Sequence, residues 1–315
     1  MKKYFFILFI LSIAQVLQSS FLKIDDTAIS FGLGSTGVSY IRGASSMLVN
    51  PASTYYRKAF NITLSQYMGP ESIACSYIGA VKGIPKFGAL GLALKSLYPL
   101  DEIKMINEKG EYIGEQINFY SYLIDINFSH RLITLFDGYL YSGYNLKYIE
   151  QGLWKYISYG FAADIGILYR SRYVRDLKIG VSYQNIGKLI KNFLDEQMEY
   201  PEIFRVGISF SDNIFIENLK AKRNLFFMLD LILSTGIEAD YLCFGSEYKY
   251  KRFLSIKAGY RMRLGTGFQD AEFLRNFRCG IGIKLKRMRL DYSFIPKSNP
   301  ANQFINIISI SIMMI

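Results

Sequence analysis

Residues 254–264, with the sequence LSIKAGYRMRL, decide the fold class. Alternate positions of this stretch differ in chemistry, because one set is mostly bulky and apolar and the other is small or cationic. Successive side chains of a β-strand point to opposite faces of a sheet, so this two-residue period predicts a strand with one apolar and one polar face. The apolar set is Leu254, Ile256, Ala258, Tyr260, Met262 and Leu264, and the opposing set is Ser255, Lys257, Gly259, Arg261 and Arg263.

The same period recurs in fourteen short segments that are separated by turn-forming residues. An even number of antiparallel strands is typical of single-chain bacterial membrane barrels. Long and short connections largely alternate, as they do in such barrels, although the long connection 211–222 falls on the side of the short turns. The predicted strands are 59–67, 72–81, 86–95, 116–133, 139–150, 158–170, 176–186, 202–211, 223–234, 240–249, 253–264, 276–285, 288–295 and 303–313.

The polar faces distinguish a soluble sandwich from a membrane barrel. A sandwich hides its apolar faces in a core, and its outer faces are usually rich in Thr, Lys and Glu. Here the polar faces combine Gly and Ala with charged residues, a mixture that suits the lumen of a barrel whose apolar face meets lipid. We therefore predict an all-β fold, a 14-stranded antiparallel transmembrane β-barrel. The predicted lumen charges are Arg205, Lys257, Arg261, Arg263 and Arg278.

The N-terminal region predicts export. Residues 1–20 have a basic start at Lys2 and Lys3, an apolar run over 4–14 and small residues at Ser19 and Ser20, which is typical of a secretory signal peptide. Residues 21–58 are rich in Gly, Ser and Ala and lack sustained alternation, so we expect a plug or hatch segment there. Residues 59–315 then form the barrel, and the expected location is the outer membrane.

Composition and motifs argue against catalysis and against nucleic-acid binding. The net charge of +11 is spread singly through the strand-like segments, with no basic helix or zinc-finger spacing. Cys75, Cys243 and Cys279 are too dispersed for a metal site or a disulfide framework, and His130 is the only histidine. The glycines at 32, 34 and 37 match G-x-G-x-x-G without the following helix and acidic residue of a dinucleotide site. We expect no enzyme activity, no metal and no cofactor.

The stretch 43–52, GASSMLVNPA, resembles the N-terminal segment of FadL-like outer-membrane barrels, which include long-chain fatty-acid transporters and PorV/PorQ-type proteins. The resemblance implies a hatch inside a fourteen-stranded barrel, with Asn50, Pro51 and Ala52 as its contact, and insertion by a barrel-assembly machinery. Two further stretches, 290–296 and 201–209, resemble PorV-type and spirochaete-like members. The stretch between Gly43 and Asn50 is shorter than is usual in the family, and Ile315 stands where assembly signals have an aromatic residue.

The leading functional hypothesis is passive uptake of a hydrophobic molecule, such as a long-chain fatty acid, with outer-membrane lipid and the hydrophobic ligand as partners. We expect Gly88 and Gly91 to bend the strand at 86–95 and open the wall, because glycine weakens strand interiors. The alternatives are a PorV-like partner of a secretion or surface-attachment system and a general diffusion porin. Helical spacing in 187–201 predicts a short amphipathic helix that captures the ligand, through Leu189, Ile190, Phe193, Leu194 and Met198.

Overall fold

The computed structural model describes residues 21–70, 72–106, 112–135, 138–174, 176–193, 199–211, 225–235, 240–251, 253–265, 276–296 and 305–314. The predicted signal peptide lies outside these residues and stays a prediction. Among the residues described, no helix has both the length and the apolar character needed to cross a membrane.

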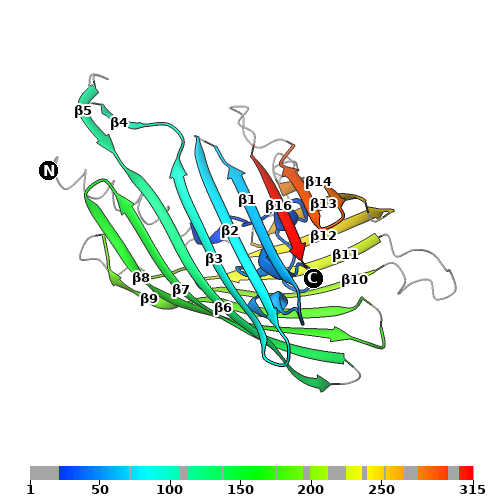
Figure 1. Ribbon diagram of the computed structural model, residues 1–315. Coiled ribbons are helices and arrows are strands. Elements are labelled where there is room, and N and C mark those ends of the chain that lie inside the picture. The colour runs from blue at the N-terminus through cyan, green and yellow to red at the C-terminus, as the bar shows by residue number, and fades with distance from the viewer. Residues whose placement is uncertain are drawn as a thin grey trace.

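Fourteen antiparallel strands close into a barrel, which confirms the predicted fold class (Figure 1). Closure is made by β1 and β16, which pair from Phe60 opposite Met314 to Met68 opposite Asn306. Every predicted strand is present. The barrel strands are β1 Phe60–Met68, β2 Ile73–Ile84, β3 Gly88–Pro99, β6 Phe119–Leu135, β7 Gly138–Leu153, β8 Tyr156–Ser171, β9 Lys178–Lys191, β10 Ile203–Ser211, β11 Leu225–Ser234, β12 Tyr241–Tyr250, β13 Leu254–Arg263, β14 Phe277–Leu285, β15 Met288–Phe294 and β16 Asn306–Met314.

A separate two-stranded hairpin lies in the connection between β3 and β6. It consists of β4 (Ile103–Ile106) and β5 (Tyr112–Ile117), whereas the predicted strands leave residues 96–115 outside any strand. The barrel wall is also uneven, because β6, β7 and β8 have 17, 16 and 16 residues whereas β15 has seven. A tilted strand needs about 9–11 residues to cross a membrane, so the long strands extend beyond it.

The outer surface of the wall is apolar. Leu92, Ile126 and Leu146 are 58%, 56% and 58% exposed, whereas the adjacent inward residues Ala93, Asp125 and Lys147 are buried. A soluble protein would reverse this distribution, since it buries large apolar side chains and leaves charges in water. The apolar row of each strand therefore faces outward to lipid, as a transmembrane barrel requires.

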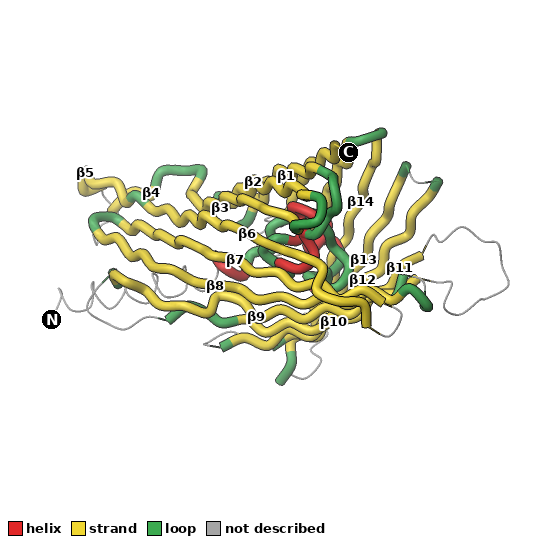
Figure 2. The backbone as a smooth tube through the Cα atoms, turned by 60° about the horizontal axis from the view of Figure 1, so that its bottom comes forward, coloured by secondary structure: helices red, strands yellow, loops and turns green. Residues whose placement is uncertain are grey.

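Residues 21–56 occupy the lumen, whereas Arg57 and Lys58 are exposed, and Figure 2 shows the helical turns of this segment inside the ring of strands. The short helix α2 (Ala28–Gly32) contacts β13–β16, and the 3-10 turn η1 (Gly43–Ser46) contacts β1 and β2. A second 3-10 turn, η2 (Pro51–Thr54), contacts β6, β7 and β8 on another part of the wall. This segment, called the plug below, therefore reaches the wall on several sides.

Inward-facing glycines make room for the plug. A Cβ at Gly143 would lie 2.2 Å from the carbonyl carbon of Pro51, and one at Gly166 would lie 2.2 Å from Oδ1 of Asn50. At Gly259 it would lie 2.0 Å from the backbone nitrogen of Gly34. The small residues of the polar face thus admit the plug backbone to direct contact with the wall.

Candidate functional site

Asn50 fixes the plug turn η2 to the wall. Its Oδ1 accepts a hydrogen bond from the amide of Ala52 at 3.0 Å and so caps the turn, whose first residue is Pro51. Its Nδ2 donates to the carbonyls of Val38 at 2.8 Å and Ile167 at 3.1 Å. One buried side chain therefore joins two turns of the plug to strand β8. The role of 50–52 in gating stays a prediction.

Two neighbouring carboxylates hold the start of the plug between distant parts of the wall. Asp25 pairs with Arg278 of β14, with 2.7 Å between Oδ2 and Nη1. Asp26 pairs with Lys95 of β3, with 2.6 Å between Oδ1 and Nζ. In the barrel β15, β16, β1 and β2 separate these two strands, so the carboxylates act as a clamp across the lumen.

Asp25 is in a strongly cationic setting. Burial alone would raise its pKa, but the charges of Arg278 and Arg261 and hydrogen bonds from Ser35 and Ser30 outweigh burial and hold the pKa of Asp25 below its ordinary value. The carboxylate therefore stays ionised inside the lumen, as a buried charge can when it is paired and hydrogen-bonded.

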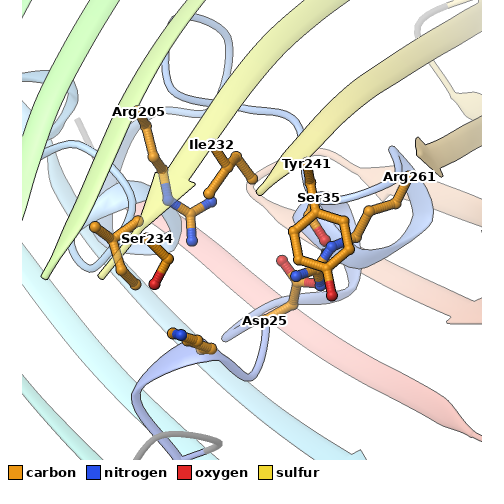
Figure 3. A pocket seen from close by; sticks show the side chains of 9 residues that line it. Asp25, Ser35, Arg205, Ile232, Ser234, Tyr241 and Arg261 are labelled. Carbon is orange, nitrogen blue, oxygen red and sulfur yellow. The ribbon is translucent and has the colours of Figure 1, made fainter. Parts of the chain in front are cut away.

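A small pocket lies beside this clamp, at the junction between the plug and strands β10–β13 (Figure 3). Its free volume of about 10 Å³ has room for one water-sized group. The guanidinium of Arg261 lies over the ring of Tyr241, with 3.6 Å between the guanidinium carbon and the ring centroid. The lining residues are Lys23, Asp25, Ser35, Ile203, Arg205, Ile232, Ser234, Tyr241 and Arg261.

The five residues predicted to be lumen charges have different surroundings in the structure. Arg205 and Arg261 line the pocket, and Arg278 reaches it through Asp25 and Ser35. Lys257 is buried and instead pairs with Asp291 of β15, whereas Arg263 is exposed at the end of β13. The sequence placed all five on one face, but it could not tell which of them meet a partner from a distant strand.

The lumen also contains an apolar cluster, close to the inward charges of Asp125 and Lys147, which the sequence reasoning missed. Phe21, Met47 and Leu48 of the plug pack with inward residues of β2, β3, β6 and β7. These inward residues depart from the rule that lumen positions are polar, and that departure was the available signal. The buried wall residues of this lumen cluster include Tyr77, Leu97, Leu123, Ile149 and Leu153.

The predicted capture helix over 187–201 is wrong at its start, because residues 187–191 belong to strand β9. Leu189 packs against the lumen cluster, whereas its neighbour Ile190 is 63% exposed on the other face. Short apolar runs fit both periods, and pairing with β8 decides for the strand here. Phe193 is buried in the lumen cluster, and Leu194 and Met198 lie outside the described residues. Among the described residues, those predicted to capture the ligand therefore lie on both faces of the wall and do not form one surface.

Gly88 and Gly91 lie in an intact wall. Strand β3 pairs with β2 from Gly88 to Pro99 and with β6 from Ala89 to Leu97 without a register shift. A Cβ at Gly91 would lie 2.8 Å from the sulfur of Met47, so this glycine makes room for the plug. In this closed structure they do not open the wall, and their role in gating stays a prediction.

Irregular pairing occurs instead between β8 and β9. The register shifts between Tyr159 and Gly160 and between Ala163 and Ile165. Near the second shift Asn185 has a φ of 63°, and its amide donates to Oδ1 of Asp164 at 2.8 Å. The carboxylate therefore supports a bulge, a feature that re-aims side chains and bends a strand.

The motifs weighed for catalysis take structural places. Gly34 of the G-x-G-x-x-G match lies in the plug against β12 and β13. His130 stacks on Phe128 with 5.3 Å between ring centroids and is 3.3 Å from the hydroxyl of Ser142. Within the described ranges, no group of three or more His, Cys, Asp or Glu residues is placed to hold a metal ion.

Comparison with known proteins gives a structural likeness without a sequence match. No family model matches the chain. No curated protein sequence matches it either. Among solved structures, the chain is similar to the toluene transporter TodX of Pseudomonas putida, with a TM-score of 0.55, 12% identity and coverage of 91% of this chain and 96% of that one.

Two further structures share the architecture. The toluene transporter TbuX of Ralstonia pickettii has a TM-score of 0.53 and 13% identity, over 91% of this chain and 96% of that one. A FadL homologue of Pseudomonas aeruginosa has a TM-score of 0.52 and 9% identity, over 91% of this chain and 98% of that one. The chain therefore has the FadL-like fold, as the sequence resemblance implied.

Proposed function

We propose that this protein is an outer-membrane channel for the passive uptake of hydrophobic small molecules. The single observation that carries the proposal is the apolar cluster in the plugged lumen, in which Met47 and Leu48 of the plug pack with Leu97 and Leu123 of the wall. An apolar molecule stays in contact with water in a water-filled pore. Contact with an apolar surface that excludes water lowers the free energy of that molecule. The solved structures that share the fold include two toluene transporters.

Within that class, we favour an amphipathic cargo such as a long-chain fatty acid. The lumen cluster provides an apolar surface for a chain. Arg205, Arg261 and Arg278 provide positive charge elsewhere in the same lumen, which favours a carboxylate over a neutral hydrocarbon. In this proposal Leu189 and Phe193 form part of the passage, and movement of 50–52 opens it.

Uptake into proteoliposomes tests the proposal. We expect the wild-type protein to take up a labelled fatty acid and labelled toluene at rates above those of protein-free liposomes. Replacing Leu123 by Asn places an amide in the apolar cluster, and it should reduce uptake several-fold without creating ion conductance. A matched control is Lys251→Gln, because Lys251 is exposed in the turn between β12 and β13.

Deletion of residues 24–52 separates the plugged channel from its alternatives. It should change uptake and raise single-channel conductance, because the segment fills the lumen. Unchanged uptake after the deletion would contradict the mechanism. Large conductance of the wild type would favour a general porin. A stoichiometric co-purifying partner, with no bound lipid by mass spectrometry, would favour a secretion or surface-attachment role.

A further inference from the structure

The junction between the plug and strands β10–β14 holds more arginine side chains than carboxylates. Arg205, Arg261 and Arg278 lie in or beside the small pocket, against the carboxylates of Asp25 and Asp230. An uncompensated charge is expensive to bury, so each cation needs a partner or a bound counter-ion.

Neither carboxylate has an oxygen turned to Arg205 at ion-pair distance. Asp25 accepts hydrogen bonds from Ser30 on Oδ1 and from Ser35 and Arg278 on Oδ2. Asp230 uses Oδ2 for the amides of Gly37 at 2.6 Å and Val38 at 2.9 Å. Both groups therefore help to fix the plug, while Oδ1 of Asp230 is buried without a hydrogen-bond partner among the described residues.

Arg205 is the side chain that indicates a ligand. It is only 8% exposed, and it points from β10 into the pocket in Figure 3. Its Nε and Nη1 are buried, and within the part of the chain that the structure describes they have no hydrogen-bond partner. The Nε atoms of Arg261 and Arg278 are in the same condition. Donors of this kind form their strongest hydrogen bonds with anions.

The size of the space limits the occupant. About 10 Å³ admits one water-sized group, which fits a halide ion or one oxygen of a carboxylate and excludes a bulky anion. We propose that this pocket binds a single small monovalent anion, which neutralises Arg205 and Arg261 and bridges strands β10 and β13. The anion is either a free halide or the carboxylate of an acid that has entered the lumen, and both present the same chemistry to the guanidinium groups.

The anion has a consequence for stability. The carboxylate of Asp25 is ionised and accepts the hydroxyl of Ser35, so the anion takes its hydrogen bonds from Arg205 on β10 and Arg261 on β13. An anion that binds only the folded barrel stabilises it by mass action. Small anions should therefore stabilise the folded protein, and their removal should destabilise it.

Bromide is the direct probe, because its anomalous scattering locates it in crystals of the full-length protein. We expect a bromide peak within hydrogen-bond distance of Arg205 and its loss in Arg205→Gln and in Arg261→Gln. Arg263→Gln is the matched control, because Arg263 lies on the same strand as Arg261 but is exposed. The bromide peak in Arg263→Gln should equal that of the wild type. Bromide found only at surface positions, an adventitious ion only, would overturn the proposal.

A solution measurement covers variants that fail to crystallise. In detergent, chloride should raise the thermal midpoint relative to gluconate at equal ionic strength. Arg205→Gln should weaken the apparent chloride affinity about tenfold or more, the size expected for loss of a charged hydrogen bond. Equal behaviour in chloride and gluconate would overturn the site.

Competition identifies the source of the anion. Decanoate that displaces bromide from the pocket indicates a subsite for the head group of an acid, whereas bromide that persists beside decanoate indicates a halide site. Toluene should leave bromide in place in either case. These measurements do not involve transport, so failure of the proposed uptake and failure of the anion site give different results.

Discussion

Single residues hold the plug in two ways, by hydrogen bonds and by the absence of a side chain. Asn50 joins Val38, Ala52 and Ile167, whereas Gly259 allows the backbone of Gly34 to touch the wall. The resemblance of the sequence to hatch segments predicted that Asn50 makes a contact of the plug. The requirement at Gly259 was not visible in the sequence, since a glycine on a lumen face is expected wherever space is needed.

Replacing Asn50 by Ala should destabilise the docked plug by about 1–3 kcal/mol, because the carbonyls of Val38 and Ile167 lose their donor in a buried setting. Urea unfolding in detergent and protease protection of the plug measure the loss. Asn50→Ser retains a good cap but cannot supply both donors. Full stability in the serine variant would show that the links to Val38 and Ile167 contribute little.

Gly259→Ala should destabilise the protein by about 1–3 kcal/mol, since overpacking in a well-packed interior costs that much. The added Cβ would lie 2.0 Å from the nitrogen of Gly34, and a backbone atom cannot move aside cheaply. The control is Ala258→Ser on the outward face of the same strand. A free energy of unfolding equal to that of the wild type would contradict the close approach.

At the scale of elements, the two-residue period predicted the strands well and the connections poorly. All fourteen barrel strands are present, because each has one lipid-facing row of apolar side chains. The prediction was wrong at 187–191, where a helix was expected and strand β9 is found, with Leu189 facing the lumen cluster and Ile190 facing outward. A run of adjacent apolar residues fits a helix as well as a strand, and only the pairing with β8 decides between them.

The clamp made by Asp25 and Asp26 predicts an acid-sensitive plug. The pKa of Asp25 is lowered in the folded protein, so its contribution is fully present above its ordinary pKa of 3.8 and is lost as the pH falls through the lower folded value. Protease protection of the plug should therefore weaken below about pH 4. Asp25→Asn should be less protected at neutral pH and should lose most of this pH dependence. An unchanged acid transition in that variant would assign the effect to another group.

At the scale of the whole molecule, the lipid-facing belt and the filled lumen determine what the barrel can do. The outward rows are apolar around the described wall, and the inward rows include both a charged junction and an apolar cluster. A general pore would need an open aqueous lumen. The plug fills that space instead, and glycines of the wall make room for it.

Leu92→Arg tests the belt. Leu92 is outward on β3 and 58% exposed, and an arginine near the middle of a bilayer destabilises a barrel by about 2–4 kcal/mol. The measurement is the urea midpoint for folding into lipid vesicles. Tyr173→Arg is the control, because Tyr173 is 86% exposed in the turn between β8 and β9. Equal midpoints for the two variants would mean that Leu92 does not face hydrocarbon.

The sequence by itself determined the class of the fold, the positions of the strands and the character of their two faces. Each of these properties depends on neighbouring residues, because alternation along a strand is a local pattern. Only the tertiary structure decided the partners: Arg278 meets Asp25, and Asn50 meets Ile167. It also decided that glycines on the polar face make room for the plug and that the lumen contains an apolar cluster. Such contacts join residues far apart in the chain, and closure of the barrel brings them together.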